Sequence, residues 1–196
     1  MKDNTRLDSI TPSAYTRPNF YYLPKSGAYE FNNVVFSISS LYDTDQPFIK
    51  REHIKTDKTC IALYHGTLSG ATNDDNYTFT QTHNSTLKSK HDFINYDACL
   101  LGDIHKAQAI TPLIQYSGSL IQQNYGESLR KHGFLLWDIT NPTNITTSFH
   151  DIRSDYGMIT IHITDNQITN YPPDIPKYTS LRAYIKNTTQ SQIDDI

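Results

Sequence analysis

The stretch Ala98-Cys99-Leu100-Leu101-Gly102-Asp103-Ile104-His105-Lys106 decides how this chain is interpreted. A short apolar run ends at Gly102, and two potential metal ligands, Asp103 and His105, follow at positions i and i+2. On an extended segment such residues point to the same side, with their Cα atoms about 7 Å apart, so both side chains can face one metal centre. The spacing therefore predicts a metal-binding strand end.

A second apolar run, from Cys60 to Tyr64, leads directly into His65 and Gly66. In open α/β sheets, sites form where the carboxyl ends of neighbouring strands meet. We therefore expect His65 to join Asp103 and His105 as a metal ligand. For each histidine taken alone, the alternative of a hydrogen-bonded structural residue stays open.

Longer blocks around these runs carry a resemblance to a known family. Phe93 to Lys106 is followed by Tyr116–Leu120 (YSGSL) and then by His132–Asp138 (HGFLLWD). In this order, the blocks resemble calcineurin-like metallophosphoesterases, in the branch of DNA double-strand-break repair nucleases and their phage and large-virus relatives. The resemblance covers nearly the whole chain and is most specific between Tyr96 and Trp137.

The resemblance implies a dinuclear centre, usually of manganese, that activates a water molecule to attack a phosphodiester. His65 looks like the family's single-histidine motif, and Gly102 to His105 looks like its terminal Gly-His-x-His motif, with Asp103 in place of the first histidine. A carboxylate suits Mn²⁺ or Mg²⁺ at least as well as imidazole does. By this match, His65 and Asp103 would serve one ion and His105 the other. His132 is a possible accessory residue.

Three earlier motifs of the family, Asp-x-His, Gly-Asp-x-x-Asp and Gly-Asn-His-Asp/Glu, are absent from the sequence. They would supply the bridging carboxylate, an Asn ligand, two ligands of the first metal and the His that assists the leaving group. The opening segment from Asn4 to Pro12 looks like the part that directly follows the third motif. A site with two ions about 3.5 to 4 Å apart needs ligands on both sides. We therefore expect weak or no metal binding, and no efficient hydrolysis without a complementing N-terminal segment.

A sheet-rich α/β (α+β) fold is expected, because the 14 tyrosines and the frequent threonines favour strands. The resemblance implies the C-terminal half of a four-layer α/β/β/α sandwich, with residues 1–152 in the phosphoesterase domain and 153–196 forming final strands, a linker and the start of a capping region. A short helix is predicted from Ser85 toward Ile94. The predicted strands are Val34–Ile38, Cys60–His65, Ala98–Gly102, Leu113–Tyr116, Phe134–Ile139, Met158–Ile163 and Leu181–Lys186.

Half of a layered domain leaves strand edges and apolar sheet faces without partners, so poor stability or self-association is expected. Other segments allow two interpretations each. The polar segment from Gly66 to Thr86 is either a substrate-contacting loop or a surface insertion. Gly118 with Ser119 is either an anion-binding turn or a turn required by backbone geometry alone. The basic cluster Arg130–His132 is either a phosphate contact or solvated surface.

Composition narrows the partners and the compartment. A formal net charge of −3 argues against a general polyanion-binding protein, so nucleic acid or another phosphodiester is expected as substrate through the resemblance alone. Cys60 and Cys99 lie in apolar strands without a secretory signal, which predicts buried thiols in an intracellular protein, cytoplasmic or encoded by a virus or phage in its host cell. No apolar run approaches the roughly 20 residues that cross a bilayer, so no membrane contact is expected.

Two hypotheses of different classes remain. The chain is either a segment of a metal-dependent phosphodiesterase or DNA nuclease, inactive without the missing half, or a non-catalytic remnant or interaction module that retains the phosphoesterase sheet.

Overall fold

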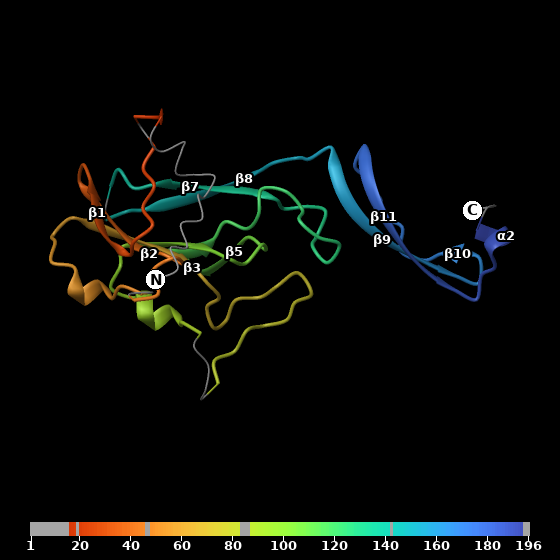
Figure 1. The fold of residues 1–196 in the computed structure, drawn as a ribbon, viewed down its shortest axis with the longest axis horizontal. Coiled ribbons are helices and arrows are strands. Elements are labelled where there is room, and N and C mark those ends of the chain that lie inside the picture. Colours follow the sequence, from red (N-terminus) through yellow and green to blue (C-terminus); the bar gives the residue numbers. More distant parts are fainter. Residues whose placement is uncertain (1–15, 19, 46–47, 83–86, 142, 194–196) are drawn as a thin grey trace, which may run out of the picture.

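The structure, a computed structural model, describes residues 16–18, 20–45, 48–82, 87–141 and 143–193. Figure 1 shows a body built around a large sheet and a long arm of strands that extends away from it. The segment from Asn4 to Pro12 and the predicted helix cap Ser85 lie outside the described residues.

The main sheet has six strands in the order β1-β2-β3-β4-β6-β5. They are β1 (Gly27–Phe31), β2 (Val34–Ser39), β3 (Thr59–His65), β4 (Ala98–Gly102), β5 (Gln108–Thr111) and β6 (Ile114–Tyr116). The four central strands β2, β3, β4 and β6 run parallel, and β1 and β5 pair antiparallel at the two edges. Parallel strands covered on both faces read as continuous apolar runs, which is why the two apolar runs of the sequence form adjacent central strands.

The register of β3 with β4 sets the edge where the polar residues gather. Tyr64 lies opposite Leu101, and His65 lies opposite Gly102, so both strands end at the same level. The expectation that the carboxyl ends of these two runs meet is confirmed.

A two-stranded antiparallel sheet, β7 (Gly133–Asp138) with β8 (Thr146–Asp151), joins the body. It is tied to the main sheet where Gln115 Nε2 of β6 donates to Thr147 Oγ1 of β8 at 3.0 Å. The arm consists of β9 (Tyr156–Thr164), β10 (Gln167–Ile168) and β11 (Tyr178–Lys186). Here β11 runs parallel to β9 over nine residue pairs, and β10 forms the opposite edge.

Helices contribute little to the described part of the chain. They are η1 (Arg51–His53), η2 (Lys90–Phe93) and α2 (Gln190–Ile193). The segment that leads to Ile94 forms only η2, whose Asp92 carboxylate accepts hydrogen bonds from the amide and the hydroxyl of Ser89 at 2.8 and 3.1 Å. The sheet-rich class is confirmed, whereas the described residues show no helical layers of a four-layer sandwich. Within the same ranges, no helix combines the length and the apolar character needed to traverse a lipid bilayer.

The core of the body packs against the central strands. Cys60 and Cys99 are fully buried free thiols, as predicted, and burial raises the pKa of Cys99 to about 12, so it stays protonated at neutral pH. Tyr116 is also fully buried, and its hydroxyl donates to Gly66 O and accepts from Leu68 N, both at 2.8 Å. This one hydroxyl fixes the turn that follows His65.

Replacing Tyr116 with Phe should lower the free energy of unfolding by about 1–3 kcal/mol, because the N–H of Leu68 and the carbonyl of Gly66 lose their buried partner. Denaturant unfolding followed by circular dichroism measures the change. The matched control is Tyr77→Phe, since Tyr77 is 61% exposed and its replacement should change stability by less than about 0.5 kcal/mol. Equal effects of the two substitutions would contradict the role given to the Tyr116 hydroxyl.

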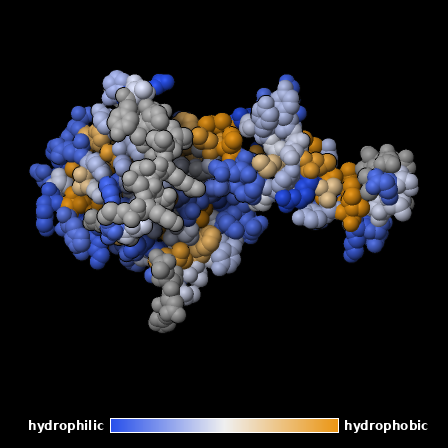
Figure 2. Space-filling view, viewed as in Figure 1, coloured by the Kyte–Doolittle hydropathy of each residue, from blue (hydrophilic) through white to orange (hydrophobic). Residues whose placement is uncertain are grey.

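Large apolar side chains lie open on the outer strands. Leu136 on β7 and Leu181 on β11 are each 55% exposed, and Ile185 of β11 is 47% exposed. Figure 2 shows hydrophobic residues at the surface of the arm and of the neighbouring part of the body. Contiguous exposed apolar patches promote association, and the free edge of β11 offers unpaired backbone groups as well.

The isolated chain should therefore self-associate, with a sedimentation coefficient that rises with protein concentration. The double variant Leu136→Lys with Leu181→Lys should shift the distribution toward monomer, because it places charges on both patches. A wild-type chain that sediments as a monomer at every concentration would refute this expectation.

Candidate functional site

The first half of the site lies at the paired ends of β3 and β4. His65 and Asp103 approach with 3.9 Å between Nε2 and Oδ1, and the Thr67 hydroxyl donates to Asp103 Oδ2 at 2.7 Å. Gly102 makes room for this arrangement, since a Cβ at that position would lie 2.8 Å from His65 Nδ1. Asp103 adopts a φ of 95°, a conformation that is unusual for a residue with a side chain and that turns the chain sharply after β4.

The second half is built on His105, two residues further along. Its Nδ1 lies 2.7 Å from Oε1 of Glu127, a carboxylate whose side chain is only 5% exposed. Glu127 is itself held by the amide of Gln123 at 2.9 Å and by the side chain of Asn124 at 2.5 Å. A carboxylate on one ring nitrogen is the usual support of a metal-binding histidine, because it fixes the ring and its tautomer and leaves the other nitrogen available. Nε2 of His105 is the nitrogen left for a ligand.

Asp103 and His105 line a common pocket of about 210 Å³, which we call the His105 pocket. The other residues of its wall are Asn73, Asp74, Asp75, Ile104, Lys106, Asn124, Gly126 and Glu127. Its carboxylates come from Asp74, Asp75, Asp103 and Glu127, whereas its only lysine, Lys106, binds the carbonyl of Asn73 at 3.2 Å. An excess of carboxylates attracts cations and repels a bare phosphate.

The described part of the segment after His65, up to residue 82, packs against the body and reaches this pocket. Leu68 and Ala71 are fully buried in the body. Across the loop, the backbone amide of Phe79 donates to the carbonyl of Ala71 at 2.9 Å, and the amide of Gly70 donates to the carbonyl of Phe79 at 2.7 Å. The tip of the loop then carries Asn73 to Asp75 to the wall of the His105 pocket. Of the two interpretations of this segment, its packing favours a loop that belongs to the site.

The three predicted ligands lie at one edge of the sheet but do not form one cluster. Asp103 is paired with His65 and shares the pocket with His105, while His65 is not part of the pocket wall. In the described part of the chain, no three His, Cys, Asp or Glu side chains lie close enough to hold one metal ion. The structure pairs His65 with Asp103 and leaves His105 with Glu127.

The turn Tyr116-Ser117-Gly118-Ser119 contacts the backbone of His105. The backbone amide of Ser119 donates to the carbonyl of His105 at 3.0 Å, so this N–H is not open to bind an anion. Gly118 has a φ of +75°, and a Cβ there would lie 2.7 Å from the same carbonyl oxygen. Backbone geometry therefore accounts for this turn, and its role is to hold the His105 backbone.

His132, the possible accessory residue, is buried beneath the same turn. Its Nδ1 lies 3.0 Å from the Ser119 hydroxyl, and its Nε2 lies 2.6 Å from the carbonyl of Ser128. Only a protonated Nε2 can bond to a carbonyl, so Nδ1 accepts from Ser119 when the ring is neutral. With both nitrogens engaged, His132 positions the turn under His105 and has no nitrogen to offer to the pocket.

The loop of residues 121–127, which carries Glu127, is also fastened to the arm. Gln122 Oε1 accepts from Met158 N at 2.6 Å, and its Nε2 donates to the carbonyls of Met158 and Glu127, both at 2.9 Å. Tyr125 contacts β11, where its ring lies 4.0 Å from the Arg182 guanidinium and its hydroxyl bonds to Ser180. The 121–127 loop therefore connects His105 to both parallel strands of the arm.

Glu127 and the aspartates of the loop tip, Asp74 and Asp75, were not predicted as site residues from the sequence. A signal for Glu127 exists in Asn124-Tyr-Gly-Glu127, a turn sequence in which Asn124 Oδ1 accepts from Gly126 N at 2.8 Å and directs the following carboxylate inward. His105 and Glu127 lie 22 positions apart in the sequence, and nothing in that spacing indicates that they pair.

Comparison with known proteins adds one relative. The chain is 38% identical over 208 aligned residues to an uncharacterized protein of Acanthamoeba polyphaga mimivirus. The alignment covers 100% of this chain but 15% of the viral protein, so the chain spans a small part of the length of that relative. No protein-family model matches the chain.

Removing the Glu127 carboxylate should change which ring nitrogen of His105 carries the proton. In the wild-type chain Nδ1 carries the proton that Glu127 accepts, and in Glu127→Ala the proton should redistribute to Nε2. Long-range ¹H–¹⁵N correlation spectra of the imidazoles, recorded above the titration range of histidine, measure this directly. Glu52→Ala is the control, because Glu52 sits beside exposed His53 at 3.8 Å and its loss should leave the His105 signals unchanged. A wild-type His105 already protonated at Nε2 would contradict the pairing.

Proposed function

We propose that this chain is a segment of a metal-dependent phosphodiester hydrolase, with nucleic acid as the preferred substrate. The observation that carries the proposal is the His105 pocket, in which an imidazole supported by a buried carboxylate stands beside Asp103 among further acidic side chains. The resemblance of the Tyr96 to Trp137 block to calcineurin-like metallophosphoesterases supports the reaction class.

The charge of the pocket supports a role for cations. A phosphodiester is an anion, and the carboxylates of Asp74, Asp75 and Asp103 would repel it. A divalent cation such as Mn²⁺, held by His65, Asp103 and His105, would offset this negative charge and would supply Lewis-acid chemistry and a more acidic bound water. A pocket of this charge suits phosphodiester chemistry only when cations are bound in it.

Each residue then has a defined task. Asp103 presents Oδ1 on the side of His65, while Thr67 holds its second oxygen. His105 presents Nε2, because Glu127 occupies Nδ1 and keeps the ring from rotating. His65 and Asp103 would bind one ion and His105 the other.

The residues present do not complete either set, so we propose that a second polypeptide segment with the three absent motifs completes the centre. A bridging carboxylate is required to hold two ions about 3.5 to 4 Å apart. The mimivirus relative, which is several times longer than the aligned region, supports a setting inside the host cell of a large virus.

Complementation tests this function. Alone, the chain should bind Mn²⁺ weakly in calorimetry and should not hydrolyse bis(p-nitrophenyl) phosphate or single-stranded DNA. Mixed with a polypeptide that carries the three absent motifs, it should gain Mn²⁺-dependent hydrolysis, which His105→Ala should abolish. Glu127→Ala should reduce the activity or the metal affinity by about 10- to 100-fold, as expected for a residue that supports a ligand.

The matched control is His53→Ala, because the His53 side chain is 64% exposed on η1 and lies outside the site. Its complemented activity should equal that of the wild-type chain. Complemented mixtures that hydrolyse no more than the His105→Ala mixture would refute the enzymatic proposal.

A second candidate, a non-catalytic remnant or interaction module, is favoured by one observation. No cluster of three ligating side chains is present among the described residues, and a remnant would retain the sheet without the chemistry. Under this candidate, the complemented mixture stays inactive while the chain keeps its strands, as circular dichroism would show.

A further inference from the structure

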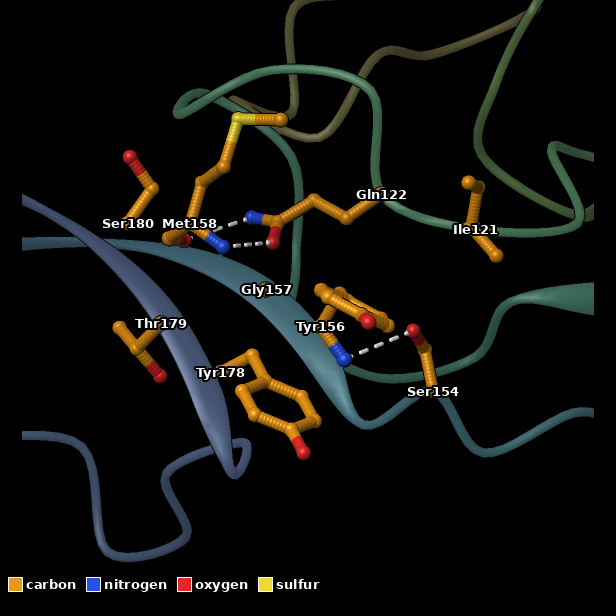
Figure 3. A pocket seen from close by; sticks show the side chains of 9 residues that line it. All are labelled: Ile121, Gln122, Ser154, Tyr156, Gly157, Met158, Tyr178, Thr179 and Ser180. Atoms are coloured by element: carbon orange, nitrogen blue, oxygen red, sulfur yellow. Dashed lines mark hydrogen bonds between the residues drawn. The ribbon is translucent and has the colours of Figure 1, made fainter.

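A second hollow lies where the arm meets the body, and we call it the tyrosine hollow. It has a volume of about 600 Å³ and opens between the starts of β9 and β11 and the beginning of the 121–127 loop. Figure 3 shows Tyr156 and Tyr178 side by side on one side of it and Ile121 and Gln122 on the other. Because Gln122 also bonds to Glu127, the tyrosine hollow and the His105 pocket lie on the same loop.

The two tyrosine rings form an open aromatic surface. Tyr156 and Tyr178 are register partners on β9 and β11, and their rings stack with centroids 4.9 Å apart and an angle of 26° between the planes. Such cross-strand pairs stabilise a sheet. Here, however, Tyr156 is 70% and Tyr178 48% exposed, so much ring surface remains open to solvent. The hydroxyls of Ser154 and Thr179 lie in the same lining. Ser154 Oγ accepts from Tyr156 N at 3.0 Å and keeps its proton to donate to the edge of a flat heterocycle, whereas Thr179 Oγ1 donates to Pro176 O at 2.7 Å and can only accept.

Basic side chains border this surface on one side. A smaller hollow shares Gln122, Ser154 and Tyr156 with the tyrosine hollow and is further lined by the cations Arg130, Lys131 and Arg153 and the anion Asp151. Arg130 forms an ion pair with Asp174 on the segment before β11. The other charged residues of that lining are the cations Lys131 and Arg153 and the anion Asp151, so the positive charges are in excess. The basic cluster of the sequence thus lies next to exposed aromatic rings, and the combination matches the chemistry of a nucleotide, with a flat base and an anionic phosphate.

We propose that the tyrosine hollow binds one base of a single-stranded nucleic acid, which stacks on Tyr156 while neighbouring phosphates contact Lys131 and Arg153. A single strand fits better than a duplex, because its unpaired bases are free to stack on side chains. This inference rests on the proposed function, since it places the strand beside the loop that holds Glu127 and His105. It gives the segment a substrate-binding surface apart from the metal ligands.

The test is equilibrium binding without metal, so that it does not depend on hydrolysis. Fluorescence anisotropy of a labelled short oligothymidine, in EDTA and low salt, should show saturable binding to the wild-type chain. Tyr156→Ala should weaken it about 5- to 100-fold, since stacking on one aromatic ring contributes in this range, whereas Tyr156→Phe should bind within about twofold of wild type. Lys131→Ala should weaken binding and reduce the slope of log K against log salt by about 1.

Two variants serve as controls. Tyr21→Ala removes an exposed tyrosine that packs on Phe31 of β1, and it should bind like wild type. His53→Ala, which changes an exposed residue outside both the site and the hollow, should also bind like wild type. Because binding is measured in EDTA, a failure of the hydrolysis experiment and a failure of this inference can be told apart. Circular dichroism confirms that each variant retains its strands, and Tyr178→Ala provides a second test should Tyr156→Ala unfold.

Absence of oligothymidine binding by the wild-type chain would overturn the inference, as would equal affinities of Tyr156→Ala and Tyr21→Ala. Thymidine monophosphate added at the same nucleotide concentration distinguishes the source of the ligand. Weak competition supports a polynucleotide strand, and full competition would assign the hollow to free nucleotides and overturn the strand assignment.

Discussion

The parallel pairing of β3 with β4 is the constraint on which the candidate site depends. It places His65 opposite Gly102, and the next residue, Asp103, therefore emerges within 3.9 Å of the imidazole. A shift of one residue would move each side chain of the strand to the other face of the sheet. The apolar burial of β3, whose first four residues are all buried, opposes such a shift and so protects the polar edge.

The turns beyond that edge depend on close backbone contacts. Gly118 passes so near to the carbonyl of His105 that a Cβ would lie 2.7 Å from its oxygen, and a Cβ on Gly102 would lie 2.8 Å from Nδ1 of His65. The Tyr116 hydroxyl then ties the Gly66 turn to the end of β6. Through these contacts, the buried core fixes the backbone that carries His65 and His105, whose side chains are partly exposed.

The sequence predicted the central strands because their patterns are strong. Ala98–Gly102 matches β4 at both ends, and Cys60–His65 differs from β3 by one residue. Strands β1, β5, β8 and β10 were not predicted. The signal for β1 is the pair Asn32-Asn33 between it and β2, where Asn32 has a φ of 54° that suits a tight hairpin, but the strand itself has mixed burial and no long apolar run. Two of the predicted ligands lie side by side, whereas the Glu127 support of His105 comes from tertiary packing that no local pattern encodes.

The double attachment of the 121–127 loop has a mechanical consequence. Gln122 holds both backbone groups of Met158 on β9, and the same amide bonds to the carbonyl of Glu127, the residue that orients His105. A movement of the arm relative to the body must therefore either break the hydrogen bonds of Gln122 or displace the Glu127 carboxylate. A force applied to the strands of the arm is therefore transmitted to the His105 ring through the three hydrogen bonds of the Gln122 amide and the Glu127 carboxylate.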